Sequence, residues 1–208
     1  RIFISDSIMQ SLILGSSSPA RQQSLKQLNL PFTVCAPHLD ETPQQGESAL
    51  QLVARLAKEK ALAVSTTHPM SLILSADQVL EVNNRILGKP HSDEGMRTQL
   101  EWCRGQKGTF WSGLCLYNAK THQLQEAIIP THITYKNFSD HRLDYYIQFS
   151  DAHQCAGGFK SEGLGPLLCD QIESTDPSAI LGLPLLTVIQ MLEAAQFPLE
   201  ATIQRSIT

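Results

Sequence analysis

The sequence predicts an α/β fold with a mixed central β-sheet flanked by helices. In the first half of the chain, short apolar runs alternate with amphipathic stretches, which is typical of strands joined by helices. In the middle, two long strand-like runs meet at a polar turn, which indicates an antiparallel hairpin. The 208 residues are 42% apolar and 17% charged. This composition excludes a disordered chain, and the length is enough to bury a core without disulfides.

The first half of the chain alternates between strand and helix signals. Ser18 is a good helix N-cap, and Pro19 suits the first helical position that follows it. A continuous apolar run after the second helix is typical of a fully buried strand, and the pair Asn83-Asn84 then indicates a hairpin turn. We therefore expect strands at residues 12–14, 32–35 and 72–80, and helices at residues 18–30 and 48–65.

The second half begins with a helix capped by Ser92 and continues into the hairpin. The segment 154–165 is rich in glycine and is expected to be irregular. We expect helices at residues 92–103, 139–149 and 183–195, long strands at 109–117 and 123–135, and a short strand at 167–169. One domain at residues 11–197 is predicted, with flanking tails at 1–10 and 198–208, the latter loosely held.

Charge and cysteine content narrow the function classes. With a net charge of −4, the protein lacks the overall positive potential that is typical of nucleic-acid binding. No nucleic-acid partner is therefore expected. No apolar run approaches the roughly 20 residues that span a bilayer, and residues 1–10 lack a signal-peptide layout, so no membrane association is expected. Five dispersed cysteines indicate free thiols in a reducing compartment. A cytoplasmic protein is predicted.

A strand, a small polar loop and a helix start follow one another at residues 12–21. Backbone N–H groups at such a helix start bind anions, and Ser16 lies in the loop. Arg21 in the first turn opposes the helix dipole unless an anion lies between them. The segment therefore fits either a phosphate site or an ordinary capped helix with a surface arginine.

Other charged residues stand at unusual positions. Lys60 interrupts the apolar stripe of the helix at 48–65, so its ammonium either snorkels to water or points into a cleft. Asp77 interrupts a buried strand, where an unpaired carboxylate is costly, so it either caps a turn or faces a cation, a metal or a crevice. Lys89 lies between Gly88 and Pro90, which restrict the backbone; the alternative is a solvated lysine in a turn.

The glycine-rich loop contributes Lys160 and Glu162, which are either ligand contacts or an incidental surface pair. Taken together, cations at structurally unusual positions in an acidic protein indicate a polyphosphate ligand. The neighbouring carboxylates Glu41 and Asp77 suit Mg²⁺, which binds through one or two carboxylates plus substrate phosphates.

In order along the chain, these segments resemble the Maf family of nucleoside triphosphate pyrophosphatases. The matching residues are 12–19 (LILGSSSP), 40–41 (DE), 55–57 (RLA), 60–61 (KA), 75–79 (SADQV), 88–90 (GKP) and 182–184 (GLP). The resemblance implies two lobes around a cleft, as in inosine triphosphate pyrophosphatases. Within the family, Gln78 with residues 155–163 (CAGGFKSEG) and 176–177 (DP) is most similar to the 7-methyl-GTP pyrophosphatase branch.

The resemblance also implies roles for individual residues. Asp77 would be the catalytic base, and Glu41 and Asp77 would hold a divalent cation, Mg²⁺, Mn²⁺ or Co²⁺. Lys160 would support the site. The triphosphate would be bound by Ser16, Arg21, Lys60 and Lys89, and the base would be selected by Ala20, Gln78 and Glu162.

The implied reaction is hydrolysis of 7-methyl-GTP to 7-methyl-GMP and pyrophosphate. This is a house-cleaning activity that removes modified nucleotides. The resemblance also allows a homodimer. Two alternatives stay open: a dTTP/UTP pyrophosphatase of the same family, and a non-catalytic nucleotide-binding regulator of cell division. The dTTP/UTP branch usually has Thr and Gln where this chain has Gln78 and Glu162. The chain departs from its own branch at Ala20, where a larger side chain is usual, and at Gln22, where a second arginine is usual.

Overall fold

The computed structural model describes residues 10–207, with side chains up to residue 203, and nearly all of the predicted tail at 1–10 lies outside this part. A seven-stranded sheet runs through the molecule in the order β2-β1-β3-β5-β6-β7, with the short β4 paired to β3. β1 pairs in parallel with β2 and β3, and the other pairings are antiparallel. The predicted mixed sheet is confirmed. The strands are β1 (Leu12–Leu14), β2 (Thr33–Val34), β3 (Leu72–Val82), β4 (Arg85–Leu87), β5 (Lys107–Asn118), β6 (Gln123–Tyr135) and β7 (Cys169–Ser174).

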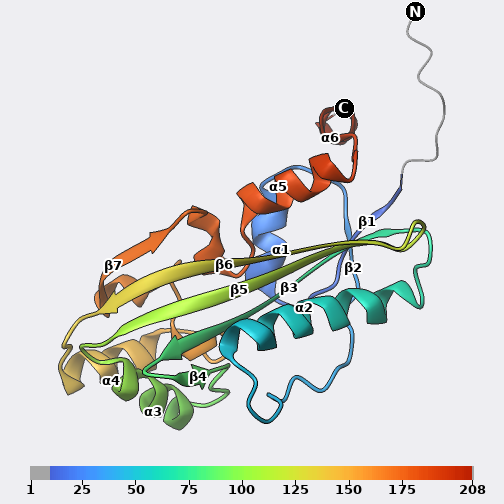
Figure 1. Ribbon diagram of the computed structural model, residues 1–208. Helices are drawn as coiled ribbons and strands as arrows, with labels where there is room; N and C mark the ends of the chain where they lie inside the picture. Colours follow the sequence, from blue (N-terminus) through green and yellow to red (C-terminus); the bar gives the residue numbers. More distant parts are fainter. Residues whose placement is uncertain (1–9, 208) are drawn as a thin grey trace, which may run out of the picture.

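Helices cover both faces of the sheet (Figure 1). Helix α2 packs along one face, whereas α1 and α5 lie on the opposite face and α3 and α4 lie together at the far end. The helices are α1 (Pro19–Lys26), α2 (Ala49–Ser65), α3 (Asp93–Cys103), α4 (Asp140–Phe149), α5 (Leu185–Ala194) and α6 (Leu199–Ile207), with short 3₁₀ segments η1 (Ala156–Gly158), η2 (Gly165–Leu167) and η3 (Pro177–Leu181).

Two apolar cores share the face of the sheet that lies opposite α2. Because side chains alternate along a strand, the even-numbered positions of β3 all face this side. Leu72, Leu74 and Ala76 belong to the core beneath α1 and α5, whereas Leu80 and Val82 belong to the core beneath α3, α4 and η1. Gln78, at the position between the two cores, is polar and half-buried. These cores form the two lobes that the sequence predicts, and the polar position marks where they part.

The structure corrects three predictions about the elements. The segment 165–167 is a 3₁₀ turn and the strand runs instead from Cys169 to Ser174, because Gly165-Pro166 favours a tight turn over an extended backbone. The polar, largely exposed β7 lacks the apolar alternation that reveals a strand. The tail after residue 197 is not loosely held: α6 buries Leu199 and Thr202. The helix predicted at 18–30 ends earlier, at Lys26.

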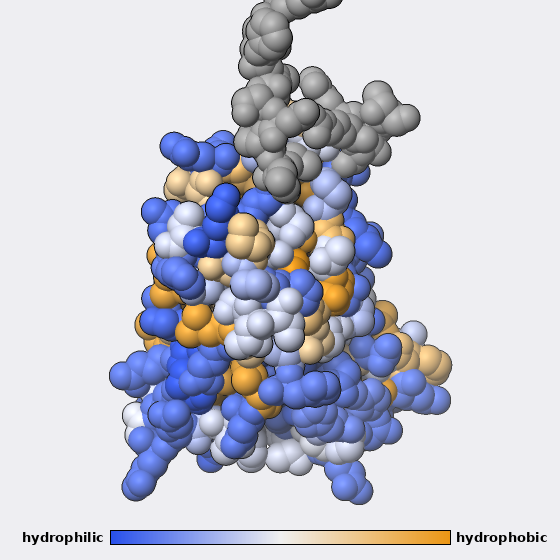
Figure 2. Space-filling model, turned by 90° about the vertical axis from the view of Figure 1, so that its right-hand side faces the viewer, coloured by the Kyte–Doolittle hydropathy of each residue, from blue (hydrophilic) through white to orange (hydrophobic). Residues whose placement is uncertain are grey.

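Figure 2 shows the molecule from the right-hand side of Figure 1, and this face is mostly hydrophilic, with apolar side chains scattered over it. None of the helices in the described part of the chain combines the length and the hydropathy that crossing a bilayer requires.

Candidate functional site

The N-terminus of α1 forms one wall of a cavity. Ser18 caps the helix by accepting from the backbone N–H of Arg21 at 3.4 Å, and the Ser16 hydroxyl accepts from the N–H of Ser18 at 3.2 Å. The Arg21 side chain is buried, donating from Nε to the Gly182 carbonyl at 2.9 Å and from Nη1 to the Ser16 hydroxyl at 3.3 Å. The arginine predicted to oppose the helix dipole is therefore fixed beside the helix start.

Lys60 is buried and does not snorkel to water. Its Nζ lies 2.6 Å from Asp77 Oδ1 and 2.9 Å from Glu41 Oε1. Helix α2 packs on β3, so Lys60 meets Asp77 on the odd-numbered face of that strand. Of the alternatives that the sequence leaves open for Asp77, pairing with a cation is confirmed. Removing one partner of such a buried pair costs about 3–5 kcal/mol.

The charges around this cavity leave a positive excess. Arg21, Lys60 and Lys89 contribute three positive charges, against two negative charges from Glu41 and Asp77. Burial lowers the pKa of Arg21, while the charges of Asp77 and Glu41 raise it in part. Burial opposes ionisation of Glu41, but Lys60, Lys89 and Arg21 outweigh burial, so the pKa of Glu41 lies below its usual value. The excess of positive over negative side chains suits an anionic ligand.

The loop that carries Glu41 is tied to α2 by an arginine. Arg55 binds Glu47 through two parallel contacts, Nε to Oε1 at 2.6 Å and Nη2 to Oε2 at 2.9 Å. Arg55 also donates to the Thr42 carbonyl at 3.2 Å and to Glu59 at 3.1 Å. The segment 41–47 is thereby held against the helix that carries Lys60. Arg55 belongs to the segment RLA that resembles the family, but sequence reasoning assigned it no role.

A second cavity adjoins the first, since both are lined by Ser18, Arg21 and Lys89. The first cavity is also lined by Ser16, Glu41 and Lys60, and the second by Ala20, Gln78 and Glu162. Phe159, Ile180 and Leu181 supply an apolar wall to the second cavity. A compartment with converging charges is thus joined to one that is half apolar, an arrangement that fits a polyphosphate attached to a base.

The loop that carries Glu162 is anchored from beneath by a buried tyrosine. The Tyr146 hydroxyl donates to the Gly158 carbonyl at 2.8 Å and accepts from the Lys160 N–H at 2.9 Å. Burial raises the pKa of Tyr146 to about 12, so the hydroxyl keeps its proton at neutral pH. Gly157 and Gly158 adopt positive φ, which explains the glycines in this loop. Sequence reasoning missed Tyr146, since nothing in the helix pattern distinguishes it.

The structure brings nearly all of the predicted site residues to the two cavities. Asp77 is one exception: it lines neither cavity and is hydrogen-bonded to Lys60, which lines the first. Lys160 is the other exception, since it lines neither cavity and its hydrogen bond to Tyr146 is made by its backbone N–H. Sequence reasoning also missed Ser112, which is hydrogen-bonded to Gln78.

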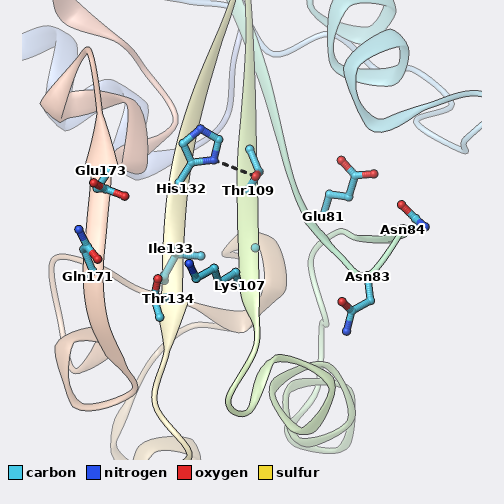
Figure 3. A pocket seen from close by; sticks show the side chains of 11 residues that line it. Glu81, Asn83, Asn84, Lys107, Thr109, His132, Ile133, Thr134, Gln171 and Glu173 are labelled. Atoms are coloured by element: carbon cyan, nitrogen blue, oxygen red, sulfur yellow. Dashed lines mark hydrogen bonds between the residues drawn. The ribbon is translucent and has the colours of Figure 1, made fainter.

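A larger hollow, the outer trough, lies elsewhere, on the α2 side of the sheet (Figure 3). It has a volume of about 440 Å³ and is lined from β3, β5, β6 and β7, with Glu81, Thr109, His132 and Glu173 among its side chains. Figure 3 shows these side chains spread over the strands, with one hydrogen bond among those drawn, between His132 and Thr109. Apart from the buried Ile133, the lining side chains are exposed or half-buried, as expected for the solvated face of an antiparallel sheet.

The chain is similar to known proteins over most of its length. The family model Maf, described as Maf-like protein, matches residues 11–195. This chain belongs to the Maf family. A relative named 7-methyl-GTP pyrophosphatase from Ralstonia nicotianae is 43% identical over 190 residues, covering 91% of this chain and 98% of the relative. Relatives of the same name from Nitrosococcus oceani and Pseudomonas fluorescens are 40% and 41% identical, covering 90% and 89% of this chain and 94% and 97% of their own lengths.

Among solved structures, a nucleoside-triphosphatase / dITP/XTP pyrophosphatase from Mycobacterium abscessus is similar at 13% identity and a TM-score of 0.42. The match covers 62% of this Maf-family chain and 76% of that chain.

Proposed function

We propose that this Maf-family protein hydrolyses nucleoside triphosphates to the monophosphate and pyrophosphate, with 7-methyl-GTP as its substrate. The observation that carries the proposal is the Lys60 ammonium held between Asp77 and Glu41, beside a cavity with excess positive charge. The names of relatives more than 40% identical support the same substrate.

The chain's own groups suit each part of this reaction. Arg21, Lys60, Lys89 and the N-terminus of α1 bind the triphosphate oxygens. Asp77 orients the attacking water and takes its proton as the water oxygen bonds to the α-phosphorus. The bond from the α-phosphorus to the bridging oxygen breaks, and pyrophosphate leaves with its charge stabilised by the cations.

The residues present also fit a divalent cation. Two carboxylates, Glu41 and Asp77, flank one ammonium, and within the described residues no group of three or more His, Cys, Asp or Glu side chains forms a metal site. Mg²⁺ typically binds through one or two carboxylates and completes its coordination with substrate phosphates and water. When bound, such a cation neutralises charge on the phosphate oxygens. Mn²⁺ and Co²⁺ are the alternatives.

Base selection rests on the second cavity. The Glu162 carboxylate accepts from N–H donors on a guanine edge, and the positive charge of an N7-methylated base favours a nearby carboxylate. Ala20 also lines this cavity, and its small side chain leaves room for the base. A cytoplasmic location and a homodimer remain predictions.

The deciding experiment measures pyrophosphate release from 7-methyl-GTP, GTP, UTP and dTTP, with Mg²⁺ and then with Mn²⁺ or Co²⁺. We expect the highest kcat/KM with 7-methyl-GTP. A preference for UTP or dTTP would retain the chemistry and overturn the base assignment. Turnover of none of the four would reject the enzymatic proposal and favour a nucleotide-binding regulator.

A further inference from the structure

A polar pair crosses the sheet between the two apolar cores. Gln78 on β3 lies directly opposite Ser112 on β5. On the same face, Leu80 and Phe110 belong to one core, and Leu114 belongs to the other. Gln78 lines the second cavity, whereas Ser112 is fully buried beneath it. A buried serine between two apolar cores needs hydrogen bonds to remain there.

The hydrogen bonds of this pair determine which way the Gln78 amide faces. Gln78 Nε2 lies 2.9 Å from the Ala179 carbonyl oxygen and 2.9 Å from the Ser112 hydroxyl. Since a backbone carbonyl only accepts, the amide atom facing Ala179 has to be the NH₂ group. The Ser112 hydroxyl donates to the same Ala179 carbonyl at 3.2 Å, so it offers Gln78 a lone pair. Both contacts therefore select the same orientation of the amide.

The opposite end of the amide faces the ligand side. Within the described residues, Gln78 Oε1 takes no hydrogen bond. Oε1 lies beside Gly182, where a built Cβ atom would stand 3.5 Å from Oε1 and 3.2 Å from Arg21 Nε. Gly182 has a φ of +83°, which disfavours any side chain there. The absence of a side chain leaves Oε1 open to the cavity that Gly182 and Gln78 both line.

We infer that Ser112 and the Ala179 carbonyl hold Gln78 as a hydrogen-bond acceptor toward the base, and that Ser112 is a positioning residue for base selection. Together with Glu162, the pocket then presents two acceptors. A guanine edge carries two adjacent donors, N1–H and the exocyclic amine, whereas a uracil edge has a single N–H between two carbonyls. The selected class is purine nucleotides whose base edge donates two hydrogen bonds. This inference rests on the proposed function and specifies how its substrate is recognised.

The test measures kcat and KM for 7-methyl-GTP and UTP in three variants. Ser112→Ala removes the lone pair that orients the amide, and Gln78→Met removes the acceptor at similar length. Thr131→Val is the matched control, because Thr131 is a fully buried strand hydroxyl that bonds Ser174 at 3.1 Å and does not contact Gln78. Thermal melting establishes that each variant is folded.

We expect Ser112→Ala to raise KM for 7-methyl-GTP about fivefold and Gln78→Met at least tenfold, with kcat changed less than about threefold. Both should lower the ratio of kcat/KM for 7-methyl-GTP to that for UTP, and Thr131→Val should leave it unchanged. The inference would be overturned if Ser112→Ala and Gln78→Met kept the wild-type ratio of kcat/KM for the two nucleotides. It would also be overturned if this ratio fell equally in all three variants. Failure of the wild-type protein to hydrolyse either nucleotide would reject the proposed function itself.

Discussion

The outer trough and the paired cavities both contain acids and bases, but the two regions hold them in different surroundings. The trough is several times larger, at about 440 Å³ against about 60 and 30 Å³ for the paired cavities. Its charged side chains stand on one open sheet face, where water screens them. Arg21 and Lys60 line the paired cavities, and Asp77 is bonded to Lys60; all three are at most 9% exposed and converge from different elements. Burial with convergence distinguishes a candidate site better than volume does.

The largest expected difference between the regions concerns one carboxylate in each. Asp77→Asn removes the proposed base, so kcat with 7-methyl-GTP should fall about 10²–10⁴-fold. Glu81→Gln makes the same chemical change in the trough, where Glu81 accepts from Trp111 Nε1 at 2.7 Å. We expect Glu81→Gln to retain kcat within about twofold, because surface changes of this kind are close to neutral. Circular dichroism should show that both variants keep the fold.

An active Asp77→Asn protein would disprove the assignment of the base. Loss of activity in Glu81→Gln would show that the outer trough takes part in the reaction. Burial of the charged groups would then not distinguish the functional region from the trough.

The anchoring of the glycine-rich loop gives the next effect in size. Tyr146→Phe leaves the Gly158 carbonyl and the Lys160 N–H without their buried partner, and the loop carrying Glu162 loses its fixed position. Unpaired buried groups cost about 1–3 kcal/mol, so we expect a lower melting temperature and a KM for 7-methyl-GTP raised about tenfold. Steady-state kinetics and thermal melting measure both changes.

Tyr117→Phe is the matched control for the tyrosine. Its hydroxyl bonds His122 Nδ1 at 2.9 Å, at the turn of the long hairpin, and Tyr117 lines neither cavity. Equal values of KM in the two phenylalanine variants would show that Tyr146 stabilises the protein without positioning the base loop.

These residues show what the sequence could predict and what it could not. Lys60 and Asp77 are detectable because each places a charge in a locally apolar pattern, and local patterns are visible in sequence. Their pairing depends on how α2 packs on β3, which local patterns do not specify. The roles of Ser112 and Tyr146 depend on strand register and on a contact between helix and loop, so they required the structure. The exposed strand β7 was misplaced because its polar residues show no alternation.

The contacts of Arg55 with Glu47, Glu59 and the Thr42 carbonyl give the smallest expected effect on stability, and this effect depends on pH. Arg55 and the Gln44 N–H hold the Glu47 carboxylate and lower its pKa from 4.5 to about 2. A group whose pKa is lower in the folded state stabilises the protein most at pH values above its unfolded pKa. The contribution of the Glu47 carboxylate to the free energy of unfolding should be complete above pH 4.5 and should be lost as the pH falls towards about 2.

Glu47→Gln tests this contribution because glutamine keeps the shape and removes the charge. Urea unfolding midpoints should lie below wild type at pH 7, and the gap should narrow progressively at pH 4 and pH 3. Salt at about 1 M should also narrow the difference in midpoint at pH 7, because the Arg55–Glu47 pair is only partly buried and salt screens it. A gap that stays constant with pH would show that the hydrogen-bond geometry, and not the charge of Glu47, holds the loop that carries Glu41 against α2. In that event the loop would keep its position in acid, and any loss of activity below pH 4 would have to arise within the cavities themselves.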